Sequence, residues 1–100
     1  MNKEIILNCL KNNLQQFKEK YNVEQIGLFG SYAKNTQSKY SDIDIAYKIN
    51  HEQCSKQYPN AFSKLIRIEE IQKELKSIFK REVDFVSDNN KKILDDIIYV

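Results

Sequence analysis

The segment that most constrains the fold lies between positions 42 and 49, where apolar residues alternate with other residues. Isoleucine stands at 43, 45 and 49 and tyrosine at 47, and Asp42 and Asp44 fall between them. A period of two predicts a β-strand in which both aspartates share one face. A partly buried carboxylate is costly without a partner, and a second one nearby raises that cost. The segment therefore predicts a cation beside Asp42 and Asp44.

The rest of the chain predicts helices packed on a small sheet. Helical spacing of apolar residues predicts helices at 3–20 and 59–79, the second beginning at Pro59, which suits the first position of a helix. Strands are expected at 23–29 and 82–86, and a short strand or tail at 97–100. Segments 31–34 and 90–96 are expected to form short helices, and 35–41 and 51–58 loops. This order predicts an α/β (α+β) fold, with residues 1–100 as one domain built around a small mixed sheet.

Composition narrows the classes of function. A formal net charge of +2 gives no bulk field for nucleic acid or an anionic membrane. Apolar runs of at most four residues exclude a transmembrane helix, and the N-terminus does not resemble a secretory signal. Two cysteines do not make a disulfide framework, so we expect a reduced cytoplasmic protein, although their even number allows one bond. Only one histidine is present, which argues against zinc and favours oxygen ligands for any metal.

A third aspartate, Asp84, stands in an otherwise apolar strand. If the strands of Asp44 and Asp84 are neighbours, three carboxylates converge, which raises at least one pKa or requires a cation. Mg²⁺ is the natural candidate, because it takes one or two carboxylates and completes its shell with water and substrate phosphates. The alternative is that these aspartates lie on the solvated face of an edge strand, and the sequence alone leaves both interpretations open.

Gly30 and Ser31 follow the first predicted strand and precede a possible helical turn. This order is typical of a phosphate-binding segment, because glycine permits close approach of the backbone and free N–H groups at a helix start favour an anion. A glycine–serine pair alone is equally typical of an ordinary turn. Its significance comes from its position, ten residues before Asp42.

Gly30-Ser31, ten further residues and then Asp42-Ile43-Asp44 resemble the signature of the DNA polymerase β-like nucleotidyltransferases. The segment GSYAKNTQSKYSDIDIAY is especially similar to the minimal nucleotidyltransferases (MNT), which consist of little more than the catalytic core. Asp84 and its apolar neighbours match the family's third carboxylate, and Lys34 fills its usual basic position. Two departures are noted. Asn35 stands where glycine is common, and Tyr32 where arginine is frequent.

The resemblance implies a polymerase β-like core and a role for each matched residue. Gly30 and Ser31 would bind the β- and γ-phosphates of ATP, with Lys34 close by. Asp42 and Asp44 would hold one or two Mg²⁺ ions. Asp84 would help to hold the second metal and accept the proton of the attacking hydroxyl. From its position, Ser41 could orient Asp42, although an ordinary loop serine explains it equally well.

The resemblance also implies a partner. MNT proteins typically pair with a HEPN-domain ribonuclease toxin and neutralise it by transferring AMP to one of its tyrosines. We therefore expect a Mg²⁺-dependent protein adenylyltransferase acting as an antitoxin. Two alternatives stay open: an antitoxin that binds and occludes its toxin without catalysis, and a small-molecule nucleotidyltransferase that needs a partner subunit. We expect no direct nucleic-acid binding and no membrane, whereas a homo- or hetero-oligomer is compatible with the sequence.

Overall fold

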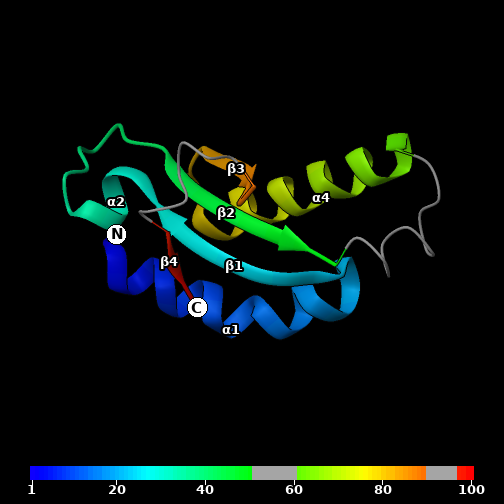
Figure 1. Cartoon of the computed structure of the whole chain (residues 1–100). Helices are drawn as coiled ribbons and strands as arrows, with labels where there is room; N and C mark the ends of the chain where they lie inside the picture. Colours follow the sequence, from blue (N-terminus) through cyan, green and yellow to red (C-terminus); the bar gives the residue numbers. More distant parts are fainter. Residues whose placement is uncertain (51–60, 90–96) are drawn as a thin grey trace.

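A computed structural model describes residues 1–50, 61–89 and 97–100 of the chain (Figure 1). The described elements follow the predicted order of helices and strands. They are α1 (Lys3–Tyr21), β1 (Val23–Phe29), α2 (Gly30–Lys34), β2 (Ile43–Ile49), α4 (Ala61–Phe79), β3 (Val83–Ser87) and β4 (Ile98–Tyr99).

The four strands form one mixed sheet in the order β3-β2-β1-β4. β1 runs antiparallel to both β2 and β4, and β2 pairs with β3 in parallel. The parallel pair requires a long crossover, and α4 supplies it. The α/β fold class with a small mixed sheet is therefore confirmed.

The hydrophobic core lies on one face of the sheet, between the strands and the two long helices. β2 and β3 contribute alternate side chains to it, as half-buried strands should, whereas β1 contributes Val23, Ile26 and Leu28, with a register shift between Val23 and Gln25. α1 is anchored at its start by Asn2, whose side chain accepts the N–H of Ile5 at 3.0 Å. The fully buried members of the core include Ile6, Leu10, Phe17, Ile26, Leu28, Ile43, Ile45 and Ile71.

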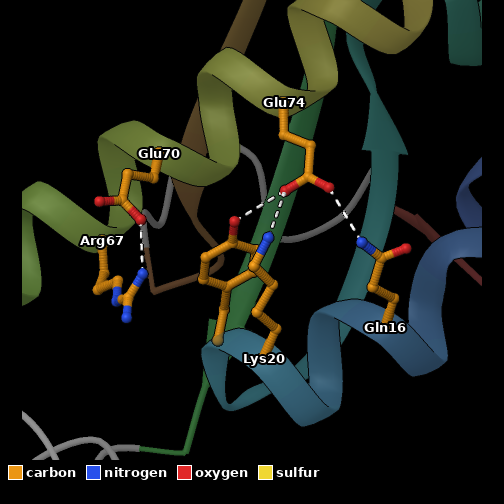
Figure 2. A network of polar contacts seen from close by, with 6 residues as sticks. Gln16, Lys20, Arg67, Glu70 and Glu74 are labelled. Atoms are coloured by element: carbon orange, nitrogen blue, oxygen red, sulfur yellow. Dashed lines mark hydrogen bonds and ion pairs between the residues drawn. The ribbon is translucent and has the colours of Figure 1, made fainter.

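A polar network joins the C-terminal end of α1 to the middle of α4 (Figure 2). The Tyr21 hydroxyl donates to Glu74 Oε2 at 2.8 Å, and Gln16 Nε2 donates to Glu74 Oε1 at 3.1 Å. The cationic heads of Lys20 and Arg67 lie 5.1 Å and 5.8 Å from the centre of the Tyr21 ring. The network fixes the approach of α4 to α1, at the end of the sheet where β1 begins.

The predicted boundaries differ from the structure by one or two residues. α1 extends one residue further than expected, and β3 is displaced by one residue, to Val83–Ser87. Such shifts are usual at helix and strand ends. The predicted loop 51–58, the helix start at Pro59 and the helix 90–96 lie outside the described residues.

The apolar residues of α4 divide into two groups along the helix. Ile71, Leu75 and Phe79 are buried in the core, whereas Phe62, Leu65 and Ile66 are exposed. The sequence had left open whether the apolar residues of this helix belong to the core or to a contact face, and only those of its C-terminal half enter the core. No helix in the described part of the chain is long and apolar enough to cross a membrane.

Candidate active site

The candidate site lies where β1 ends, α2 begins, and β2 and β3 start side by side. Gly30 is the first residue of α2 and follows β1 directly. Phe29, which precedes the helix, provides no side-chain acceptor for the first N–H groups of α2. Because no side chain caps these N–H donors, a bound phosphate oxygen could accept hydrogen bonds from them.

Gly30 packs so closely against the carboxyl group of Asp44 that any side chain at this position would displace that carboxyl. Its φ angle is +75°, in the left-handed region that favours glycine. A Cβ atom at this position would lie 2.9 Å from Asp44 Cγ and closer still to Oδ2. The predicted phosphate segment and the first strand carboxylate of the site are therefore in direct contact.

Asp44 and Asp84 face each other across the parallel pair of strands, β2 and β3. The Asp84 carboxyl group lies close enough to Asp44 to raise the pKa of that side chain. The pKa of Asp44 is raised to about 6, first by burial and then by the neighbouring Asp84 carboxyl and the negative charge of Asp42. The sequence prediction required the strands of Asp44 and Asp84 to be neighbours, and β2 and β3 are adjacent in the sheet.

Asp42 lies just before β2 and is exposed to solvent. Its charge acts on Asp44, but the three aspartates do not form a compact cluster. Among the described residues, no group of three or more His, Cys, Asp or Glu side chains is arranged to hold a metal ion. The pair Asp44–Asp84 still suits Mg²⁺, because this ion needs only one or two carboxylates and a cation relieves the repulsion that raises the pKa of Asp44.

The other predicted site residues lie around this pair. Ser31 occupies the first turn of α2, and Lys34 is exposed at its end. Ser41 is engaged in the turn before β2, where its Oγ accepts the N–H of Ser38 at 2.9 Å. This contact of Ser41 shapes the loop that leads to Asp42. The predicted hydrogen bond between Ser41 and the Asp42 side chain is not among those of the described residues.

The two departures from the family pattern have structural explanations. The Tyr32 side chain is only 2% exposed and belongs to the core, so it is directed away from any bound phosphate. Asn35 ends α2 in the left-handed conformation, with φ of 58°. Asparagine tolerates this conformation better than most residues, which explains how it replaces glycine here.

Sequence reasoning missed Arg81, which stabilises the edge of the site. Its Nη1 donates to the carbonyl oxygen of Lys39 at 3.2 Å, and so links the turn before β3 to the loop before Asp42. Nearby, the N–H of Ile43 donates to the carbonyl of Glu82 at 3.0 Å. No sequence spacing indicated this contact, because it depends on the pairing of two strands that α4 separates.

A glycine–serine segment that packs on one strand carboxylate, with a second carboxylate on the neighbouring strand of a small mixed sheet, defines a nucleotidyltransferase core. Residues 10–99 match the family described as "Nucleotidyltransferase domain". The chain belongs to this family of enzymes.

Three proteins of Methanocaldococcus jannaschii, each named "Putative protein adenylyltransferase", are 35%, 34% and 33% identical to it over 102 residues. Each alignment covers 95% of this chain and 94% of the relative.

Two solved structures of toxin-antitoxin proteins are similar in fold. One is described as a toxin-antitoxin with AMP-PNP, with a TM-score of 0.51 and 27% identity. The other is a mutant of the toxin-antitoxin MntA-HpeT in which two aspartates, separated by one residue, are changed to glutamate, with a TM-score of 0.50 and 25% identity. Each match covers 90% of this chain, which spans 60% of the length of the solved chains.

Proposed function

We propose that this chain is a Mg²⁺-dependent protein adenylyltransferase that transfers AMP from ATP to a tyrosine hydroxyl of a cognate HEPN-domain ribonuclease toxin. It would act in the cytoplasm as the antitoxin of that pair. The observation that carries the proposal is the contact of Gly30 with Asp44, which is itself paired with Asp84. A glycine–serine segment, a carboxyl group whose pKa is raised and the neighbouring carboxylate of Asp84 thus meet at one point.

The comparisons support two parts of the proposal, namely the adenylyltransferase activity and the toxin partner with its nucleotide. The adenylyltransferase activity is supported by the names of the relatives that align along almost the whole chain. The toxin partner and the nucleotide are supported by the structural neighbours, one with AMP-PNP. In the mutant neighbour the changed aspartates have the same spacing as Asp42 and Asp44 here.

In the proposed mechanism the chain's own residues bind, orient and accept a proton. Gly30, Ser31 and the start of α2 bind the β- and γ-phosphates, with Lys34 near the end of the helix. Asp44 and Asp84 would hold the Mg²⁺, with the charge of Asp42 acting from just before β2, and the bound ion would supply charge stabilisation for the phosphates.

The reaction itself is an in-line displacement at the α-phosphorus. The acceptor oxygen forms a new bond to the α-phosphorus, the bond from that phosphorus to the bridging oxygen breaks, and pyrophosphate leaves. Asp84 is exposed on the strand beside Asp44, so its carboxylate can accept the proton of the hydroxyl.

The proposal is tested by incubating this protein with ATP, Mg²⁺ and the protein encoded by the neighbouring gene, and measuring the intact mass of the latter. We expect mass to be added in adenylyl units, and an Asp44→Asn variant to add none. A matched Glu69→Gln variant removes an exposed carboxylate on α4 and should behave as the wild type. A stable complex without added mass would instead favour an antitoxin that acts by occlusion.

A further inference from the structure

The face of the sheet opposite the core carries the candidate site. Because side chains alternate along a strand, Asp44 and Ala46 of β2 point to this face, and the register places Asp84 and Val86 of β3 beside them. The two long helices pack on the other face, where the buried isoleucines of β1 and β2 lie. A nucleotide bound to the carboxylates therefore extends along the face that these helices leave free.

Small residues occupy the middle of that face. Gly27 of β1 pairs with Ala46 of β2. Ala46 is nevertheless fully buried, and a Cβ on Gly27 would lie 2.6 Å from Ile97 Cγ2. The C-terminal segment therefore lies over these two residues, and a larger side chain at Gly27 would displace it.

Tyr99 reaches across this surface and is fixed at its far end. It pairs with Gly27 at the β4 edge of the sheet, yet its hydroxyl donates to Asp88 Oδ2 at 3.1 Å, just beyond β3 at the other edge. Asp88 is the one charged side chain among the described residues that is buried, at 7% exposure. The Tyr99 ring must therefore lie over the strands between, and the side chain is still 41% exposed.

The position of this ring matches the dimensions of a nucleotide. Tyr99 lies level with Ala46, two residues along the strand from Asp44, a rise of about 7 Å. In a nucleoside triphosphate a single ribose separates the α-phosphate from the base, which is a spacing of the same order. An oriented aromatic ring with a free surface is what a flat base stacks on.

We propose that the ring of Tyr99 is the stacking surface for the base of the nucleoside triphosphate, an inference that rests on the proposed function. Asp88 is the positioning residue, because its buried carboxylate holds the phenol across the sheet. Purines present a larger flat surface than pyrimidines, so the ring favours a purine nucleotide. Gly27 contributes by leaving room for Ile97 and the backbone of Ile98, which lead directly to Tyr99.

The test compares ATP with inorganic tripolyphosphate, which has the phosphates but no base. Dissociation constants for both are measured by calorimetry with Mg²⁺, on the full chain and its Tyr99→Leu and Tyr99→Phe variants. We expect Tyr99→Leu to weaken ATP binding about 5- to 100-fold, the range for loss of one base–aromatic stack. Its tripolyphosphate affinity should stay within about twofold, and Tyr99→Phe, which keeps the ring, should retain most of the ATP affinity.

Each other outcome has a distinct meaning. Equal ATP affinity in Tyr99→Leu and the wild type overturns the inference, and a raised KM for the protein acceptor in that variant would then assign the ring to the acceptor. Equal loss of both ligands also overturns it, because the ring would then support the fold or the phosphate site. If the wild type binds neither ATP nor tripolyphosphate, the proposed function fails, and this inference fails with it.

Discussion

Asp44 and Asp84 are register partners in the only parallel strand pair of the described sheet, and the nearby Asp84 carboxyl helps to raise the pKa of Asp44. In a parallel pair, directly opposed residues project to the same face, so the two charges cannot separate without breaking the register. Repulsion between them is thus built into the sheet. A protein that keeps such a pair needs a cation or a proton between the two carboxyl groups.

Without divalent metal, the protein should lose stability as the pH rises through the raised pKa of Asp44. That pKa is about 6 in the folded chain against an ordinary value of 3.8 for aspartate, so the folded state binds the proton more tightly. The stability from this protonation is fully present below pH 3.8 and is lost as the pH rises through about 6. The measurement is urea unfolding in EDTA from pH 4.5 to 7.5, for the wild type and Asp44→Asn.

The asparagine variant cannot titrate at this position, so it serves as the reference. Its stability relative to the wild type should increase as the pH rises. A difference between the two proteins that does not change with pH would show that Asp44 titrates normally and that the carboxylate pair is not under strain.

Gly30→Ala should lower both stability and nucleotide binding. An alanine at φ of +75° costs about 1–2 kcal/mol from backbone strain alone, and its Cβ would also displace the Asp44 carboxyl. Unfolding by urea and tripolyphosphate binding would measure the two effects separately.

Asn35→Gly is the matched control, since Asn35 also has a positive φ but ends the helix away from the carboxylates. It should change stability by about 0.5 kcal/mol or less, and leave binding unchanged. If Gly30→Ala behaved like this control, the close contact with Asp44 would be disproved.

Tyr32→Arg should damage the fold although it restores the residue that is frequent in the family. The Tyr32 side chain is 2% exposed within the core, so an arginine would bury an unpaired charge there. We expect a loss of about 3 kcal/mol or more in the free energy of unfolding. Tyr32→Phe should lose about 1 kcal/mol or less, and a well-folded arginine variant with tighter ATP binding would contradict the assignment of this residue to the core.

Glu74→Ala should reduce stability without changing transfer activity. It removes the acceptor of two hydrogen bonds between α1 and α4, and we expect a cost of about 1–3 kcal/mol. The network includes Tyr21, which lies just before the start of β1, whereas Asp44 pairs with Phe29 at the other end of that strand. Glu70→Ala, which removes a surface pair with Arg67, should cost about 0.5 kcal/mol. A loss of activity in Glu74→Ala at full folding would link this network to the site.

The local parts of the fold were predictable because their signals are local. The alternation after Asp42 and the helical spacing in the first twenty residues depend only on neighbouring positions, and both elements appear with nearly the expected bounds. The strand of Asp84 was also expected, but its neighbour was not, because pairing depends on how α4 crosses the sheet. The contact between Asp44 and Asp84 was therefore conditional in the sequence and is explicit in the structure.

The sequence was least informative about residues whose role arises from distant contacts. Nothing in the sequence relates Asp88, a possible cap of the helix predicted at 90–96, to Tyr99, and only the sheet order brings the two together. Gly27 gave no signal as an isolated glycine in a strand, since its need for space depends on Ile97. The burial of Tyr32 was not predictable, because arginine is frequent at this position in the family that the sequence resembles.

The strand order also determines when the site can form during folding. β1 and β2 are joined by a shorter connection and can pair early. β2 and β3 are separated in sequence by the whole of α4, so their pairing must wait until that helix has packed. Contacts that close long loops form slowly, because chain entropy is lost before they contribute. Asp84 thus joins Asp44 late, and a nascent or partly folded chain has Gly30 and Asp44 without the third carboxylate. We expect refolding chains to recover secondary structure before they recover metal-dependent ATP binding, so the capacity for transfer is withheld until the crossover is complete.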